Sequence, residues 1–317
     1  MTLPSANIQI QTRELRLDFG ELTAVNNLNL NIHAGEIYGL VGPNGAGKTS
    51  LLRMLASLLI PTYGDVSVGG IDLVQNPSEA HGLIGYMPDL SPVAPDLKVW
   101  EFLEYFAAAY GIPRAGRQAR VNTCLDQVGM LEYRGAFGNT LSRGMTQKVV
   151  LAKTLLPQPR ILLLDEPASG MDPIARINLK HILTELSCQG VTTIISSHIL
   201  SELEDMCSSV GIMDHGKLLR SGTLGNVLNE KPKKTITLTV LEKANLAIEL
   251  ITDRSNISSP RQDNNKLTFE LAGNDKDAAD LLCLLIQNEI PVVSFRRESS
   301  SMEETLISVV NENKRQS

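Results

Sequence analysis

The chain has 317 residues, of which 43% are hydrophobic and 20% charged, and its formal net charge is −6. This length suits about two domains, and the composition excludes a disordered chain, a collagen-like fibre and a disulfide scaffold. The acidic balance, without a long Lys/Arg run, argues against nucleic acid as a partner. No apolar run reaches the roughly 18 residues of a spanning helix, and the first residues do not resemble a secretory signal. We therefore expect a cytoplasmic protein.

The cysteines give a second constraint on the class of protein. They are Cys124, Cys188, Cys207 and Cys283, and they include no CxxC pair and no neighbouring His at ligand spacing. We expect reduced, buried thiols rather than a metal site or a disulfide framework.

Residues 8–41 alternate short β-like segments with turns. The period of two over 8–10, 14–17 and 28–32 predicts strands of a partly antiparallel sheet. Residues 37–41 are nearly all apolar, which predicts a buried strand, and a glycine-rich turn and a helical pattern follow directly. A buried strand that leads through a loop into a helix is the unit that binds phosphate.

The turn after this strand fits the phosphate-binding motif G-x-x-x-x-G-K-[ST]. Its glycines let backbone N–H groups curl around a phosphate chain, and the following helix directs its positive dipole end there. We expect the Lys48 ammonium to reach the β- and γ-phosphates and the Thr49 hydroxyl to bind Mg²⁺. A glycine-rich turn without function is the alternative, but the position between strand and helix favours the motif. The residues predicted to contact nucleotide are Gly42, Pro43, Asn44, Gly45, Ala46, Gly47, Lys48, Thr49 and Ser50.

A mainly helical region follows over about residues 90–160. Three prolines between 88 and 95 interrupt regular structure, and apolar residues then recur at helical spacing over 97–110 and 121–128. Ser142 is a good N-cap residue, so we expect a third helix to start there.

Two further buried strands deliver polar residues to the carboxyl edge of the sheet. The strand at 161–164 is followed by Asp165 and Glu166, and the strand at 192–196 ends close to His198. In α/β proteins this edge binds ligands. We expect Asp165 to hold Mg²⁺, mostly through water, and Glu166 to orient or deprotonate the water that attacks the γ-phosphorus.

The segment Leu141–Met145 reads LSRGM and resembles the LSGGQ signature of the ATP-binding cassette (ABC) ATPases. In that family the signature binds the γ-phosphate held by the opposite subunit. The resemblance gives this role to Ser142 and Gly144, which suit it chemically at a helix N-terminus.

Three other family positions match. Residues 168–172 resemble the D-loop, which crosses the dimer interface, with Asp172 as its key residue. His198 resembles the switch histidine that touches γ-phosphate and water, and Phe19 resembles the aromatic residue that stacks on adenine, with simple core packing as the alternative. Four histidines lack such a context and are expected to be structural or solvent-exposed: His33, His81, His181 and His215.

One position departs from the family pattern. Where a Q-loop glutamine usually lies, this chain has Asp89. Aspartate can offer an oxygen to Mg²⁺ or to a water, but it is shorter and cannot donate a hydrogen bond while ionised. We interpret Asp89 as a functional variant in the catalytic site, and direct coordination of the metal stays open.

After residue 230 the pattern changes. Residues 231–234 read as a linker, and then a strand (235–240), a helix (242–252), a hairpin (256–271), a helix (276–288), a strand (292–296) and a helix (302–311) are predicted. The β-α-β-β-α-β order is that of a ferredoxin-like module. Residues 300–306 resemble the closing helix of many type-2 exporter ATPase subunits. Dimer brace, regulatory site and inert packing are all open as roles of this module.

The resemblance implies an α/β P-loop NTPase of ABC type, with a parallel core sheet, an antiparallel β subdomain and a helical subdomain (about 90–160). This ATP-binding domain would span 1–230, and a small α+β ferredoxin-like domain would span 231–317.

The family function is an ATPase motor that uses ATP and Mg²⁺. Two copies, or one copy and a paralogue, close head to tail, and a separate integral-membrane permease docks on the helical region. Export follows from the type-2 branch, with the chain attached to the cytoplasmic face of the membrane through the permease.

Two alternative functions compete with that of a motor. A soluble, non-transport ABC ATPase that acts on ribosomes or DNA usually has two cassettes or a long coiled-coil insertion, and the sequence shows neither. A nucleotide-dependent regulator without hydrolysis is suggested by Asp89, but Glu166 and His198 argue against it.

Overall fold

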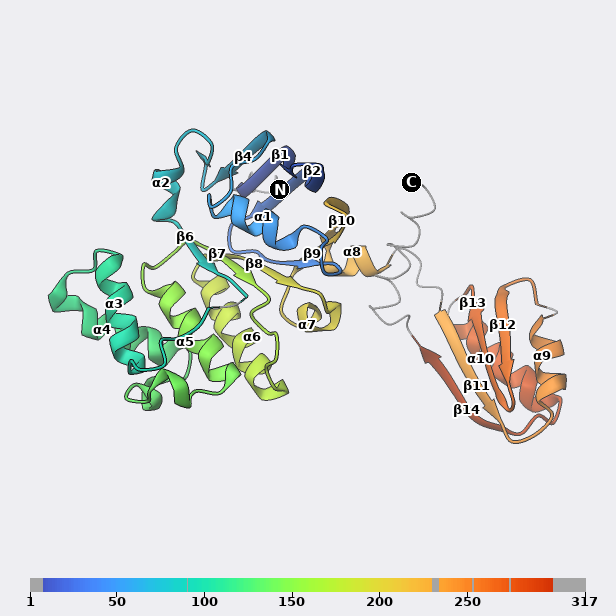
Figure 1. The fold of residues 1–317 in the computed structure, drawn as a ribbon. Coiled ribbons are helices and arrows are strands. Elements are labelled where there is room, and N and C mark those ends of the chain that lie inside the picture. The colour runs from blue at the N-terminus through green and yellow to red at the C-terminus, as the bar shows by residue number, and fades with distance from the viewer. Residues whose placement is uncertain (1–7, 90, 230–233, 253, 274, 299–317) are drawn as a thin grey trace, which may run out of the picture. The chain divides into compact units, whose positions relative to one another are not determined.

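The computed structural model describes residues 8–89, 91–229, 234–252, 254–273 and 275–298. They form two compact units, one ending at Val227 and the other beginning at Leu228 (Figure 1). The predicted last helix at 302–311 and the motif at 300–306 lie outside the described residues. Within these residues, every helix is too short or too polar to cross a membrane.

The first unit contains ten strands and eight α-helices among its described residues, with two short 3₁₀ turns. The strands are β1 Ile8–Phe19, β2 Leu22–His33, β3 Ile37–Val41, β4 Tyr63–Val68, β5 Ile71–Asp72, β6 Ile84–Met87, β7 Ile161–Asp165, β8 Thr192–Ser197, β9 Ser209–Asp214 and β10 Lys217–Thr223. The helices are α1 Lys48–Leu55, α2 Pro77–His81, α3 Val99–Ala109, α4 Arg114–Gln127, α5 Arg143–Leu155, α6 Pro173–Cys188, α7 Leu200–Glu204 and α8 Leu224–Asn229.

Two sheets organise this unit. The first is antiparallel, in the order β2-β1-β4-β5. The second has the order β10-β9-β3-β8-β7-β6, in which β9, β3, β8, β7 and β6 run parallel and β10 pairs antiparallel at the edge. The parallel core sheet and the antiparallel subdomain are therefore both present, as the sequence predicts.

The first strand differs from its prediction. The two short strands expected at 8–10 and 14–17 belong to one continuous strand, β1. Its pairing with β2 shifts register between Thr12 and Leu15, where Glu14 takes a positive φ of 47°. This irregularity is a β-bulge, which breaks the alternation of buried side chains without ending the strand.

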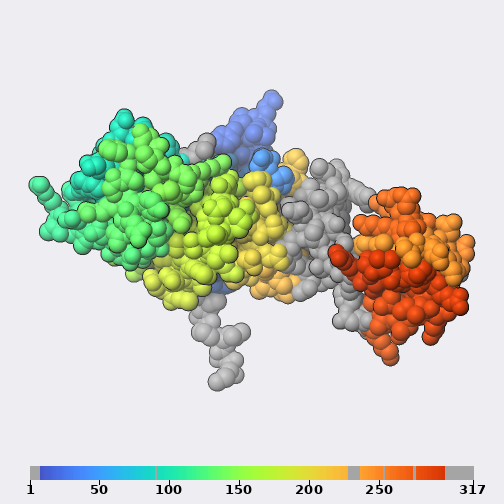
Figure 2. Space-filling view, turned by 90° about the horizontal axis from the view of Figure 1, so that it is seen from below, coloured from blue at the N-terminus to red at the C-terminus, as the bar shows by residue number. Residues whose placement is uncertain are grey.

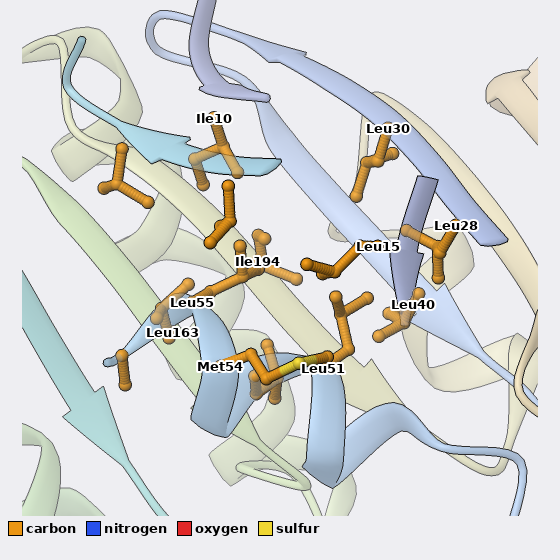
Figure 3. Packing of buried hydrophobic residues seen from close by; sticks show 14 of the residues in the cluster. Ile10, Leu15, Leu28, Leu30, Leu40, Leu51, Met54, Leu55, Leu163 and Ile194 are labelled. Carbon is orange, nitrogen blue, oxygen red and sulfur yellow. The ribbon is translucent and has the colours of Figure 1, made fainter. Parts of the chain in front are cut away.

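Helix α1 is buried between the two sheets. Its apolar residues Leu51, Met54 and Leu55 are at most 1% exposed and pack with Leu15 and Leu28 of the antiparallel sheet (Figure 3). Residues of β3, β7 and β8 complete the same cluster. Burying each such side chain contributes about 1.5–3 kcal/mol, so the start of α1 is held rigidly at the edge of the parallel sheet.

The predicted helical region corresponds to α3, α4 and α5. Helices α3 and α4 lie away from the antiparallel sheet (Figure 1), and their green residues form one end of this unit in the space-filling view (Figure 2). Helix α5 begins at Arg143, and Ser142 is its N-cap because the Ser142 hydroxyl accepts a hydrogen bond from Met145 N. The predicted start of this helix is confirmed.

The second unit has the predicted β-α-β-β-α-β order among its described residues. Its elements are β11 Lys234–Val240, α9 Ala244–Thr252, β12 Ile257–Asp263, β13 Lys266–Leu271, α10 Asp275–Gln287 and β14 Val292–Glu298. All strand pairs are antiparallel, in the order β12-β13-β11-β14. Buried residues such as Ile236, Phe269 and Leu281 form its own core. The unit therefore has ferredoxin-like topology.

The cysteine prediction holds only in part. All four are free thiols, but Cys188 and Cys283 are exposed, whereas Cys124 and Cys207 are buried. The expectation that all four are buried is wrong, because Cys188 and Cys283 lie on outward faces of α6 and α10.

Candidate functional site

Three neighbouring parallel strands bring the predicted site residues to one edge of the sheet. Strand β8 lies between β3 and β7, with Val41 paired to Ser197 and Asp165 paired to Ser196. The segments that follow β3, β7 and β8 therefore emerge side by side. This is the carboxyl edge, where α/β sheets bind ligands.

The loop between β3 and α1 requires glycine at two positions. Gly47 has a φ of 102°, and a Cβ there would lie 2.3 Å from Ala24 O. A Cβ on Gly42 would lie 2.2 Å from Met213 O. Helix α1 begins at Lys48 without a side-chain cap, so its first N–H groups are free to bind an anion.

The Lys48 ammonium lies under this loop. Its Nζ donates to Gly42 O at 2.6 Å and to Pro43 O at 3.2 Å, and it lies 3.7 Å from Glu166 Oε1. The residue is only 6% exposed. Burial lowers the pKa of Lys48, while the charges of Glu166 and Asp165 act in the opposite direction.

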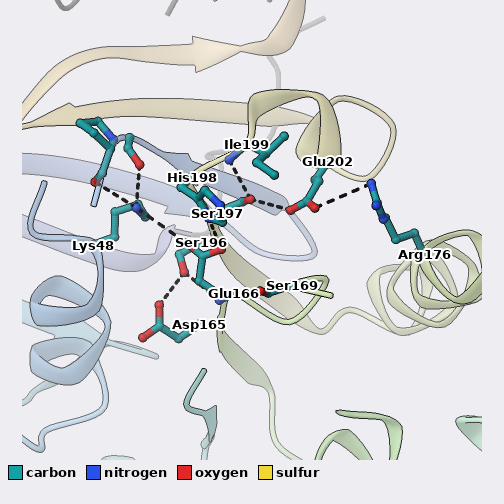
Figure 4. A network of polar contacts seen from close by, with 12 residues as sticks. Lys48, Asp165, Glu166, Ser169, Arg176, Ser196, Ser197, His198, Ile199 and Glu202 are labelled. Carbon is teal, nitrogen blue, oxygen red and sulfur yellow. Dashed lines mark hydrogen bonds and ion pairs between the residues drawn. The ribbon is translucent and has the colours of Figure 1, made fainter. Parts of the chain in front are cut away.

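A serine on the neighbouring strand holds the Asp165 carboxylate and the backbone of Glu166. The Ser196 hydroxyl donates to Asp165 Oδ1 at 2.6 Å and accepts a hydrogen bond from Glu166 N at 3.0 Å. Asp165 and Ser196 are both buried, and Figure 4 shows the hydrogen bond between them. Ser196 was not among the predicted site residues, and the register of β7 with β8 is what gives it this role.

Glu166 and His198 are in direct contact. His198 Nδ1 lies 2.9 Å from Glu166 Oε2, and Glu166 also takes a left-handed backbone with a φ of 49°. A non-glycine residue in this region costs of order 1 kcal/mol or more and often marks a functional site. The carboxylate is therefore placed between one ammonium, that of Lys48, and one imidazole.

These groups line a cleft of about 480 Å³. The predicted residues in its wall are Phe19, Asn44, Gly45, Ala46, Gly47, Lys48, Thr49, Ser50, Asp89, Glu166 and His198. Gly42 and Pro43 are not in the wall, but their carbonyls accept from Lys48. Asp165 lies behind it, held by Ser196.

Three further predicted residues lie outside this wall, at the starts of two helices. Ser142 caps α5, and Gly144 is the second residue of that helix. The Asp172 carboxylate caps α6 by accepting from Ala175 N at 2.8 Å. None of the three residues lines the chain's own cleft.

Asp89 provides a test of whether the cleft suits a magnesium ion. Its Oδ1 is buried, and no described residue gives it a hydrogen bond. Among the described residues no three His, Cys, Asp or Glu side chains gather into a ready metal cluster. Mg²⁺ is usually bound by one or two carboxylates together with substrate phosphates, so the oxygens of Thr49, Asp89 and Asp165 fit this ion.

The cleft wall also contains residues that were not predicted from the sequence. They are Leu22, Thr23, Ala24, Ser169 and His215. His215 was expected to be structural or solvent-exposed; it is exposed, but it also forms part of the cleft wall. The turn between β9 and β10 reaches the loop because Gly216 N donates to Ala46 O.

A glycine-rich phosphate loop, an opposed carboxylate pair and this parallel sheet define the class of P-loop nucleotide-binding proteins. Comparison with known proteins agrees. Residues 25–169 match the family described as "ABC transporter". The chain belongs to the family of ABC transporter ATP-binding proteins.

Three curated relatives illustrate the similarity. The ABC transporter ATP-binding protein NatA of Bacillus subtilis is 34% identical over 69% of this chain and 90% of its own length. The Nod factor export ATP-binding protein I of Cupriavidus pinatubonensis is 31% identical over 70% of this chain and 68% of its own. The probable multidrug ABC transporter ATP-binding protein YbhF of Escherichia coli is 36% identical over 68% of this chain, but the match spans only 37% of YbhF.

Solved structures show the same fold. An ATP-binding subunit of an ABC transporter has a TM-score of 0.62 and 27% identity, covering 69% of this chain and 91% of that one. A dimeric bacterial ABC transporter cassette has a TM-score of 0.62 and 24% identity over 68% of this chain and 98% of its own.

Proposed function

We propose that this chain is the ATP-binding and ATP-hydrolysing motor subunit of an ABC transporter. One observation carries the proposal: the Glu166 carboxylate lies between Lys48 Nζ and His198 Nδ1, at 3.7 and 2.9 Å, in the wall of the nucleotide cleft. A carboxylate in this position is suited to orient or deprotonate a water. The imidazole can in turn orient the carboxylate.

The cleft wall suggests how ATP binds. The Phe19 ring, half exposed at the cleft, is suited to stack on adenine. The backbone of residues 44–50 and the positive end of α1 would surround the phosphates. Lys48 would leave its carbonyl partners to contact the β- and γ-phosphates.

Thr49, Asp165 and Asp89 would hold Mg²⁺ beside the phosphates. When bound, this ion neutralises phosphate charge and orients the phosphate chain. The 2.6 Å hydrogen bond from Ser196 would keep Asp165 oriented toward that position.

The active form would be a head-to-tail dimer of two copies or of this chain with a paralogue. Ser142, Gly144 and Asp172 lie outside the chain's own cleft wall, and they would complete the site of the opposite subunit. A cassette of the same fold is dimeric, which supports a dimer here.

The export role rests on the relatives. Their names describe multidrug transport and Nod factor export. In this chain an integral-membrane permease would dock on the helical subdomain, about 90–160, and attach the protein to the cytoplasmic face of the membrane. The ATP-binding domain would span 1–230 and the accessory domain 231–317.

Two measurements test this function. The first is phosphate release from ATP by the wild-type chain and by a Glu166→Gln variant, and we expect release only from the wild type. The second is recovery of the tagged chain from its native membrane fraction in mild detergent. We expect an integral-membrane protein in near-equal amount.

Each measurement can overturn a different part of the proposal. Phosphate release no higher than that of the Glu166→Gln variant would overturn hydrolysis and favour a nucleotide-dependent regulator. Recovery of ribosomes, nucleic acid or no partner would overturn transport and leave a non-transport ABC ATPase.

A further inference from the structure

A buried carboxylate outside the nucleotide cleft lies close to the His198 segment. Glu202, on the short helix α7, is only 6% exposed. Burying a charged group is costly unless it is paired and hydrogen-bonded. Its partners therefore indicate what the residue does.

One carboxylate oxygen fixes the backbone around His198. The Ser197 hydroxyl donates to Glu202 Oε2 at 2.8 Å and accepts a hydrogen bond from Ile199 N at 3.1 Å. The hydroxyl thus connects the residues on both sides of His198. The His198 side chain is 42% exposed, so its position at Glu166 depends strongly on this backbone.

The other oxygen connects to the segment 168–172. Glu202 Oε1 lies 3.7 Å from Arg176 Nη1, and Arg176 Nε donates to Met171 O at 3.2 Å. Met171 directly precedes Asp172. A continuous chain of polar contacts therefore joins the His198 segment to this loop. Figure 4 shows its part from Ser197 through Glu202 to Arg176.

We propose that Glu202 is a positioning residue: through Ser197 it places His198 against Glu166, and through Arg176 it couples this placement to the loop 168–172. The inference rests on the proposed ATPase function. It assigns Glu202 no contact with nucleotide, since Glu202 is not part of the cleft wall. Its removal is therefore expected to slow hydrolysis without weakening ATP binding.

Ser197→Ala is the most selective test, because it removes one hydroxyl at a buried position. We expect kcat for phosphate release to fall by about tenfold to about 100-fold, with the Kd for ATP unchanged within about twofold. Glu202→Gln keeps the shape but loses the charge toward Arg176, and we expect a smaller fall in kcat. Thermal unfolding and ATP binding are measured for each variant to check that it is folded.

An ion pair on the surface joins α6 to the end of α7 and provides a matched control. Lys180 Nζ lies 3.9 Å from Asp205 Oδ1, with both side chains well exposed. Lys180→Ala is expected to leave kcat and Kd as in the wild type. An equal fall in this variant would show a general structural effect and overturn the proposal.

A double-mutant cycle with His198→Ala distinguishes positioning from general support of the fold. If Ser197 acts through His198, adding Ser197→Ala to His198→Ala causes little further loss of kcat. A Ser197→Ala variant with wild-type kcat, or fully additive losses, would overturn the proposal. A wild-type chain without phosphate release would instead overturn the proposed function, and this inference with it.

Discussion

Glu166 Oε2 lies 2.9 Å from His198 Nδ1, while Glu166 Oε1 lies 3.7 Å from Lys48 Nζ. Each oxygen of one carboxylate thus has its own nitrogen partner, one at the start of α1 and the other directly after β8. The carboxylate is only 13% exposed. It is therefore fixed in direction, as a group that orients a water must be.

Replacing Glu166 by Gln is expected to abolish steady-state phosphate release and to retain ATP binding. The amide keeps the size of the side chain but cannot accept a proton as a carboxylate does. Closed dimers should accumulate with ATP, and size-exclusion chromatography at micromolar concentration would detect them. The double variant Glu166→Gln, Lys48→Ala is the control and should stay monomeric. A Glu166→Gln chain that is monomeric in ATP would count against the head-to-tail dimer.

Lys48→Ala should weaken ATP binding. A charge-assisted contact to phosphate is worth about 1.5–3 kcal/mol, which corresponds to about a tenfold to about a 150-fold rise in Kd. Titration calorimetry would measure it. Lys217→Ala, at an exposed lysine on β10, should leave Kd unchanged. Equal affinities in Lys48→Ala and the wild type would exclude Lys48 as a phosphate ligand.

Phe19→Ala should weaken ATP binding by about 1–3 kcal/mol, because this is the usual free energy of stacking a base on an aromatic ring. Phe19→Tyr keeps an aromatic ring and should bind ATP nearly as well as the wild type. Phe137 offers a control, because it is 45% exposed against 50% for Phe19 and lies outside the cleft wall. Wild-type affinity in Phe19→Ala would favour a packing role for this ring.

The phosphate loop could be predicted from the sequence because its function depends on consecutive residues. At Gly47 the backbone has a φ of 102°, and an added Cβ would lie only 2.3 Å from Ala24 O, so only glycine fits. The positions of Asp165, Glu166 and His198 could be predicted for a related reason, since a polar residue at the end of a buried strand, or directly after it, lies at the sheet edge.

Other parts of the site depend on pairing between distant segments. His215 reaches the cleft because its turn contacts β2, where Asn26 N donates to Gly216 O at 2.8 Å. Ser196 orients Asp165 only because β8 lies beside β7 in that register. No local pattern encodes either contact, so neither residue could be assigned from the sequence.

The cysteines should fall into two classes of reactivity. Burial raises the pKa of Cys124 to about 11 and that of Cys207 to about 12. At pH 8 both therefore stay protonated, and the thiolate is the reactive form. We expect a disulfide reagent to modify two thiols rapidly in the native chain, those of Cys188 and Cys283, and four after unfolding.

The double variant Cys188→Ser, Cys283→Ser checks this assignment. It should show no rapid thiol in the native state and two after unfolding in guanidinium. Rapid modification of this variant at pH 8 would show that the buried thiols are accessible.

The left-handed backbone at Glu166 should lower the free energy of unfolding by a measurable amount. With a φ of 49°, alanine at this position carries a steric penalty of about 1–2 kcal/mol that glycine avoids. We therefore expect Glu166→Gly to unfold at higher urea concentration than Glu166→Ala, as followed by the fluorescence of Trp100, the single tryptophan. At Glu185, an exposed position in α6, the order should reverse, because glycine in a helix is about 1 kcal/mol less favourable than alanine. If alanine is the more stable residue at both positions, the backbone at Glu166 is not strained.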